Sequence, residues 1–183
     1  MMEDIFDDYI WNNGLIDACT EGDIELAKIM IQHGANKWNE GLEIACKKGH
    51  KDLALLMIEH GANDWNRGLK YACYGGHKEL VLLMIEKGAN NWNWALVNAC
   101  EGGHKDLALL MIEKGANKWN WGLEQACVGG HKELALLMIE KGANINNCSL
   151  ILLEEDIDVL IKLGIRKQIN IRNCSTDVIV KLL

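Results

Sequence analysis

Four histidines at one regular spacing are the first residues of this chain that could do chemistry. They stand 27 residues apart, at His50, His77, His104 and His131. Histidine is a common metal ligand, but residues in successive stacked units would lie roughly 10 Å apart, whereas zinc needs its ligands about 2 Å from one ion. We therefore expect no metal site. Each histidine is interpreted as a turn residue that bonds to loop backbone between two helices.

Five of the seven cysteines follow the same interval, at Cys19, Cys46, Cys73, Cys100 and Cys127. In a small secreted protein such a number would suggest disulfides. In stacked units, however, neighbouring cysteines would be about 8–10 Å apart, which is too far for a bridge. We interpret these cysteines as small core residues, and we expect a cytoplasmic location in a reducing cytosol.

No residue set meets the requirements of a catalytic site. Serine occurs only at Ser149 and Ser175, both at expected helix starts. The Gly-Gly-His-Lys segments at Gly75, Gly102 and Gly129 lack the spacing of a phosphate-binding loop and its preceding strand. The chain is therefore expected not to be an enzyme, with no catalytic residue, cofactor or metal.

Composition excludes several other classes of partner. The net charge of −7 and the pI near 5.4 argue against nucleic-acid binding, which requires clustered basic residues. The sequence has no apolar run of the roughly 18 residues that a membrane helix needs. It starts with acidic residues, unlike a secretory signal. We expect no nucleic-acid partner and no membrane partner.

The histidines and cysteines belong to an internal repeat. Residues 92–118 and 119–145 are identical at 21 of 27 positions, and a fixed period of this size indicates stacked supersecondary units. In the second copy, Leu42, Ala45 and Cys46 fall on one face of a short helix, for which Asn39 is the expected N-cap. Residues 52–59 predict a second helix, which Gly61 would end. The predicted fold is an all-α helix-turn-helix solenoid.

This repeat resembles the ankyrin repeat. The pattern Gly-His-Lys-Asp/Glu-Leu-x-x-Leu-x-x-x-x-Gly-Ala occurs at residues 49–62, 76–89, 103–116 and 130–143, and Leu-x-x-Ala-Cys marks the first helix. The family's unit of about 33 residues is shortened here to 27. The shortening falls in the segment that makes β-hairpin fingers, so shortened or absent fingers are expected. The tryptophan-marked version is similar to arrays of giant DNA viruses of amoebae.

The resemblance covers residues 11–145 as five copies. Residues 1–10 are expected to form an N-terminal cap, in which Ile5, Phe6 and Ile10 could cover the first core. Residues 146–183 are expected to form a degenerate repeat and a C-terminal capping helix, because the period fails there.

Variation between the copies predicts where a partner binds. The second helix is nearly constant, whereas the first helix varies at i, i+3, i+4 and i+7, positions that share one face. By the resemblance, this face lines the concave groove of a protein-protein interaction module, with a host or viral protein as the partner. Tryptophan, tyrosine and arginine dominate interface hot spots. The predicted partner-binding residues are Arg67, Lys70, Tyr71, Tyr74, Trp94, Val97 and Trp121.

Three alternatives stay open at this stage. Leu55, Leu82, Leu109 and Leu136 could form a convex apolar stripe for self-association, although a monomer is expected. The tryptophans at Trp11, Trp38, Trp65, Trp92 and Trp119 could be an exposed stacking platform, although closing the core is favoured. A ubiquitin-ligase adaptor would need a docking motif in residues 146–183.

Overall fold

The computed structural model describes residues 2–144 and shows ten helices in five antiparallel pairs. None of these residues forms a strand, which confirms the all-α solenoid. The expected degenerate repeat and capping helix at 146–183 lie outside the described residues and stay predictions. The helices are α1 (Met2–Glu21), α2 (Ile24–Gln32), α3 (Trp38–Lys48), α4 (Lys51–Glu59), α5 (Trp65–Gly75), α6 (Lys78–Glu86), α7 (Trp92–Gly102), α8 (Lys105–Glu113), α9 (Trp119–Val128) and α10 (Lys132–Glu140).

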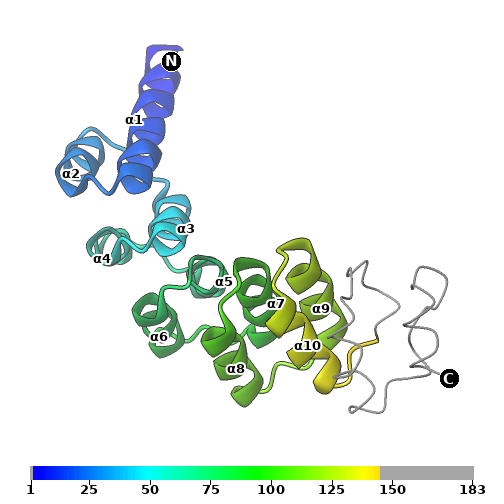
Figure 1. Ribbon diagram of the computed structural model, residues 1–183. Helices are drawn as coiled ribbons and strands as arrows, with labels where there is room; N and C mark the ends of the chain where they lie inside the picture. The colour runs from blue at the N-terminus through cyan, green and yellow to red at the C-terminus, as the bar shows by residue number, and fades with distance from the viewer. Residues whose placement is uncertain (1, 145–183) are drawn as a thin grey trace, which may run out of the picture.

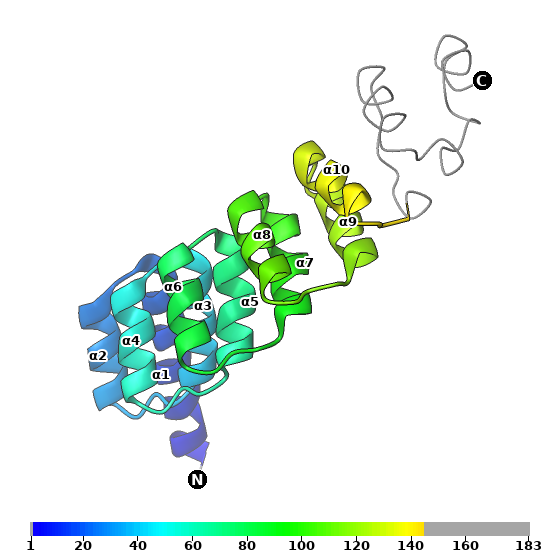
Figure 2. The ribbon, with the colours of Figure 1, turned by 90° about the horizontal axis from the view of Figure 1, so that it is seen from below.

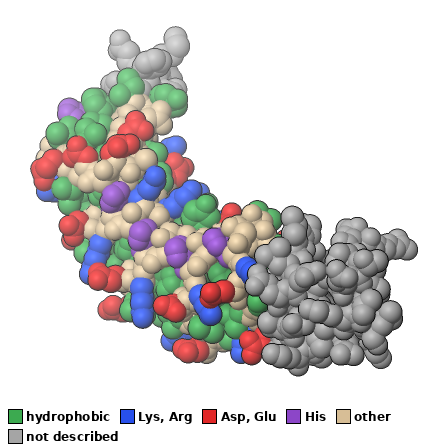
Figure 3. Space-filling model, in the orientation of Figure 1, with side chains coloured by type: hydrophobic (Ala, Val, Ile, Leu, Met, Phe, Trp, Pro, Cys, Tyr) green, Lys and Arg blue, Asp and Glu red, His purple; other side chains and the backbone are tan. Residues whose placement is uncertain are grey.

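The helices lie in two layers along a curved array. The odd-numbered helices follow the inner side of the curve and the even-numbered helices follow the outer side (Figure 1). Seen from below, α2, α4, α6 and α8 stand side by side in front of the odd-numbered layer (Figure 2). The space-filling view shows the resulting crescent (Figure 3). Helices of only nine to eleven residues cannot persist alone in water, so stacking supplies their stability.

The connections between units are too short to form a hairpin finger. Residues 60–64 are the only ones between α4 and α5, and none of them is in a strand. Gly61 has φ +113°, a conformation that favours glycine. The next amide, Ala62 N–H, donates to Met57 O at 2.9 Å and closes the helix end. The expected glycine C-cap and the absence of fingers are confirmed for the described units.

One continuous core runs through the array and contains four of the repeat cysteines. Cys19, Cys46, Cys73 and Cys100 are fully buried and free. Burial raises the pKa of the Cys46, Cys73 and Cys100 thiols to about 12, because the apolar core disfavours the thiolate. Cys127 is the exception, since it is only partly buried and its sulfur is in a disulfide. The interpretation as a purely packing residue therefore fails at that position.

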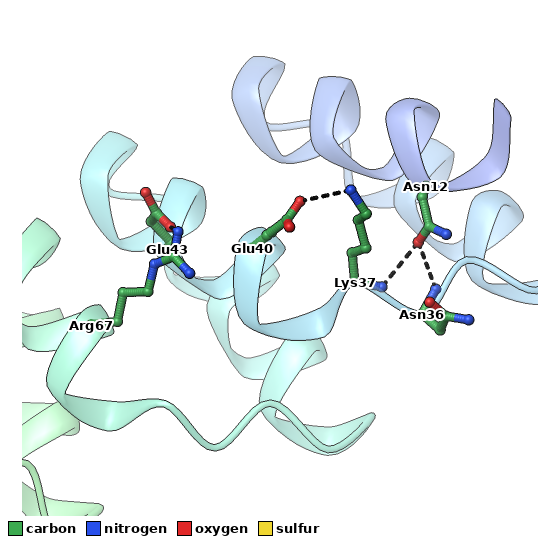
Figure 4. A network of polar contacts seen from close by, with 6 residues as sticks. All are labelled: Asn12, Asn36, Lys37, Glu40, Glu43 and Arg67. Atoms are coloured by element: carbon green, nitrogen blue, oxygen red, sulfur yellow. Dashed lines mark hydrogen bonds and ion pairs between the residues drawn. The ribbon is translucent and has the colours of Figure 1, made fainter. Parts of the chain in front are cut away.

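A row of asparagines fixes the loops that lead from each unit to the next. In the first unit, the Asn12 side-chain oxygen accepts the Asn36 and Lys37 backbone N–H groups at 2.9 and 3.0 Å (Figure 4). Asn39 does the same for Asn63 and Asp64 at 2.8 and 2.9 Å. The bonds recur from Asn66 and Asn93, and Asn120 accepts from Asn144 at 2.6 Å.

The expected N-cap role of Asn39 is therefore wrong. The helix already begins at Trp38, which leaves the Asn39 side chain beyond the capping position and directed at the following loop. Where a side chain does cap these helices, it comes two residues earlier in the repeat. Asp64 accepts from Arg67 N–H at 3.1 Å, and Asn91 accepts from Trp94 N–H at 3.4 Å.

The first helix continues through residues that were expected to form a separate cap. Residues 2–10 belong to α1, and Ile10 is 45% exposed. The boundary of an N-terminal cap at residue 10 stays a prediction.

The asparagine row gives a first testable prediction. Asn66→Ala removes the acceptor of two backbone N–H groups at 2.9 Å, so we expect the free energy of unfolding to fall by about 2 kcal/mol. The measurement is urea unfolding followed by circular dichroism. Asn66→Asp keeps an accepting oxygen and should lose less, and Asn63→Ala, an exposed residue of the same loop type, serves as the control. An equal loss for Asn66→Ala and Asn63→Ala would contradict the role of the row.

A second prediction concerns alkaline pH. The pKa of the Cys46, Cys73 and Cys100 thiols is about 12 in the folded chain, against an ordinary value of 9.0, so folding favours the protonated thiol. The contribution of each buried thiol to the free energy of unfolding is fully present below the pKa of the thiol in the unfolded chain. It is lost as the pH rises from that value toward the pKa in the folded chain, by about 1.4 kcal/mol per pH unit for each thiol. Urea midpoints measured from about pH 8 to about pH 10.5 should fall less steeply for Cys73→Ala than for the native chain. Parallel slopes would refute the assignment.

Candidate functional site

The predicted partner-binding residues occupy the part of the inner helices that faces away from the core. On α5, the buried face carries Leu69, Ala72 and Cys73. The predicted residues Arg67, Lys70, Tyr71 and Tyr74 lie at the remaining positions and are exposed or half-buried. Trp94 and Val97 follow on α7, and Trp121 on α9. Since α5 packs on α7 and α7 packs on α9, the structure brings six of these side chains to one surface, which we call the inner surface.

An ion pair and a tyrosine hold the α3–α5 part of the inner surface. The Arg67 guanidinium forms an ion pair with Glu43 from the preceding unit (Figure 4). Partial burial raises the pKa of the Tyr71 hydroxyl, as do a hydrogen bond to Glu43 and the charges of Glu43 and Glu101, while Arg67 lowers it. The Tyr71 hydroxyl therefore stays protonated at neutral pH and remains a hydrogen-bond donor.

Two lysines lie against the tyrosine rings of this part. The Lys70 ammonium is 4.7 Å from the Tyr71 ring centroid, and the Lys47 ammonium is 5.1 Å from that of Tyr74 and 6.0 Å from that of Tyr71. Cations at these distances are attracted to an aromatic face. The contacts restrict both the lysine stems and the tyrosine rings, so this part of the inner surface is ordered before any partner arrives.

Two tryptophans form the α7–α9 part. Trp94 and Trp121 are each 49% exposed, and their ring centroids are 5.8 Å apart at an interplanar angle of 39°. The Lys118 ammonium lies 5.7 Å from the Trp121 ring. A cavity of about 300 Å³ opens beside this pair and is lined in part by Lys118, Trp119 and Trp121. Indoles are costly to leave in water, so this pair is the most apolar exposed feature of the inner surface.

Val97 differs from the other predicted residues. It is only 6% exposed, and its neighbour Asn98 is 4% exposed. The Asn98 side-chain amide donates to Trp94 O at 2.9 Å, which fixes the α7 backbone below the tryptophan. Val97 therefore packs beneath the inner surface and offers almost no area for contact.

The regularly spaced histidines support this surface from the next unit. The Nε2 atoms of His77, His104 and His131 lie 3.2, 3.0 and 3.0 Å from the backbone oxygens of Lys47, Tyr74 and Glu101. These three carbonyls belong to one position of the inner helices. A row of histidine side chains is visible along the array in Figure 3. The backbone-bonding interpretation holds for these three histidines, with two differences. The carbonyls belong to helices and not to loops, and each bond joins neighbouring units rather than the two helices of one unit.

The regularly spaced tryptophans are neither fully buried nor an open platform. All five are half-buried against the core. Trp11 stacks on His33 with centroids 4.4 Å apart, and Trp38 lies 5.3 Å from His60 at a tilt. Trp11 and Trp38 thus cover the end of the second helix of their own units. The expectation that the five rings close the core is met in part, because each is packed against the core and still partly exposed.

The leucines of the outer layer do not form an open stripe. Leu82 is 48% exposed, whereas Leu55, Leu109 and Leu136 are half-buried. A single exposed leucine is ordinary on a protein surface. The described helices therefore support the milder interpretation, in which neighbouring units cover most of this row.

Three contributors to the inner surface were missing from the predicted set. Glu43 and Lys47 occupy variable positions of the first helix, so the variation could have identified them. They were not in the predicted set because that set favoured tryptophan, tyrosine and arginine. Lys118 precedes α9, outside the predicted helix face, and gave no such signal. Among residues 2–144 no group of histidine, cysteine and carboxylate side chains could hold a metal ion. No helix in that range is long and apolar enough to span a membrane.

Comparison with protein families finds a match over most of the chain. The model described as ankyrin repeats in three copies matches residues 15–93 and again residues 69–149. No curated protein matches the chain.

The histidine contacts generate a prediction about stability. His104→Ala removes the bond to Tyr74 O and the ring that packs beside Gly76, so we expect the free energy of unfolding to fall by about 2–3 kcal/mol. His50→Ala is the matched control, because its ring lies in the same way beside Gly22 while the structure shows no corresponding carbonyl bond. Denaturant unfolding should show a smaller loss for His50→Ala. An equal loss of unfolding free energy in both variants would show that the bond to Tyr74 O does not contribute to stability.

Proposed function

Because this chain belongs to the ankyrin repeat family, whose members are generally protein-protein interaction modules, we propose that it binds a protein partner through the inner surface. The observation that carries this proposal is the Trp94–Trp121 pair, since both indoles are 49% exposed and in contact with each other. Two adjacent exposed indoles leave a large apolar area in water, which is unfavourable unless a partner covers it. Tryptophan is also the residue type most enriched at interface hot spots.

The division between constant and variable positions supports the same proposal. The even-numbered helices and the buried face of the odd-numbered ones repeat Leu, Ala, Cys and Met in register. The exposed positions of the odd-numbered helices differ from unit to unit. Such a chain keeps its scaffold constant and changes only the side chains it presents. The proposed role is therefore recognition, and members of this family are usually non-catalytic.

The contacts within the inner surface favour tight docking. The Arg67–Glu43 ion pair and the lysine–tyrosine contacts hold side chains that would otherwise lose about 0.5–1.5 kcal/mol each on being immobilised by a partner. Six of the seven predicted residues contribute to this proposed site, and Val97 supports it from below. We place the module in the cytosol, with a host or viral protein as the target; that part of the proposal rests on resemblance to viral arrays.

Self-association through the outer leucines is the competing function. It requires an apolar area that Leu82 alone does not supply. Leu82→Lys with Leu109→Lys would abolish concentration-dependent oligomers under that alternative and would leave partner binding unchanged under ours.

The proposal is tested by affinity capture from a cytosolic extract of amoebae, followed by binding of the purified partner. We compare the native chain with a Tyr71→Ala, Tyr74→Ala, Trp94→Ala, Trp121→Ala variant that circular dichroism shows to be folded. A partner held by the native chain should be lost by this variant. In calorimetry, Trp94→Ala or Trp121→Ala alone should weaken binding by about 30-fold, which corresponds to about 2 kcal/mol.

The matched control is Leu82→Ser, which removes an exposed apolar side chain from the outer layer. It should bind the partner as the native chain does. Equal capture by the native chain and the quadruple variant would refute the inner surface as the site.

A further inference from the structure

We infer that the inner surface recognises an acidic linear segment that carries one bulky apolar side chain. Its carboxylates would lie at Lys47 and Lys70 and its apolar side chain on Trp94 and Trp121. This inference rests on the proposed function, because it names the chemistry of the partner for the same surface.

The lysines of the α3–α5 part are available to carboxylates. Lys37 and Arg67 on the same side of the array are paired with Glu40 and Glu43. No ion pair involves Lys47 or Lys70 in the described part of the chain, and both instead lie over tyrosine rings. A cation on an aromatic face keeps its remaining N–H groups directed at solvent. Two such ammonium groups over adjacent rings form a binding site for negative charge.

The remaining charges give the segment a direction. Glu124 lies on α9, at the end of the surface that holds the tryptophan pair. Glu101 lies on α7 between the two parts, where its charge raises the pKa of Tyr71. Glu124 would repel an acidic residue placed at the tryptophan end. Acidic residues are therefore favoured at the α3–α5 end and an uncharged apolar residue at the α7–α9 end. Lys118 lies over Trp121 and places a cation near the apolar end.

The stacking distance sets the spacing within the segment. Packed helices are about 8–10 Å apart, so the midpoint of α3 and α5 is about 16–20 Å from the midpoint of α7 and α9. An extended chain advances about 3.3 Å per residue. The carboxylates and the apolar side chain should therefore be about five or six residues apart, by the same estimate.

The charge of the whole chain adds specificity. With a net charge of −7, most of the surface repels an acidic segment, which favours its binding where cations are available. Lysine and aromatic side chains together also suit single-stranded nucleic acid. Glu101 and Glu124 lie among them without a described ion pair, however, and a continuous row of phosphates along the inner helices would meet both carboxylates.

The test is selection of random displayed peptides on the native chain, with counter-selection on the folded Trp94→Ala, Trp121→Ala variant. We expect enrichment of Asp or Glu about five or six residues from Trp, Phe or Leu. The best peptide is then synthesised and its Kd measured. Lys47→Glu with Lys70→Glu should weaken it by at least about tenfold, and more salt should weaken it as well. The matched control is Lys87→Glu with Lys114→Glu, which changes the net charge equally on exposed residues after α6 and α8.

Each other outcome overturns the inference and has its own consequence for the proposed function. Tryptophan-dependent peptides that are basic or uncharged would keep the inner surface as a protein site and refute the acidic segment. Absence of any tryptophan-dependent peptide would refute a linear segment, while the capture experiment above decides whether a folded protein docks there. If the native chain binds a poly(U) oligonucleotide, and the tryptophan variant and the Lys47→Glu, Lys70→Glu variant do not, the surface is a nucleic-acid site. If the native chain forms a concentration-dependent dimer that the tryptophan variant does not form, the surface binds a second copy.

Discussion

The fold depends on the loops that connect one unit to the next, because no unit is large enough to stand alone. Each asparagine of the Asn12–Asn120 row fixes the loop that leads from its own unit to the next by accepting the backbone amides of that loop, two of them in the first four units. In a longer repeat, a hairpin finger could pair the same loops backbone to backbone. Here the loop is five residues long, and one side-chain oxygen provides the connection instead. The asparagine row therefore provides the connection that the shortened loop can no longer make through a hairpin.

Bonds from single side chains to backbone atoms also hold the helices of the inner surface. The histidine of one unit bonds to the carbonyl at the end of the preceding inner helix, at Lys47, Tyr74 and Glu101. These bonds use backbone atoms, so the side chain at that position is free to vary without loss of the link. The constant histidines thus hold the backbone, and the variable side chains project from it. This separation lets a surface with lysine, tyrosine and tryptophan in successive units form on nearly identical helices.

Periodicity was sufficient to predict the helices and their order, because the core positions repeat and glycine marks the helix ends. It was insufficient for the side chains that leave the helix near its start. Asn39 matches the composition of an N-cap, yet the helix begins one residue earlier and turns the amide toward the next loop. Val97 occupies a variable position in sequence, but α7 brings it to 6% exposure. A pattern of residue types fixes neither the residue at which a helix begins nor how far its neighbours cover a given position.

The part of the proposed site that sequence reasoning could reach is the part where residue type alone is decisive. Arginine, tyrosine and tryptophan at exposed helix positions favour a contact surface whatever their rotamers. The contacts among them needed coordinates, because a lysine from the preceding unit, Lys47, reaches both Tyr71 and Tyr74. This contact between units turns separate residues into a charged aromatic surface. A partner that fits it must satisfy the ammonium groups and the indoles together, which is a stricter requirement than apolar complementarity alone.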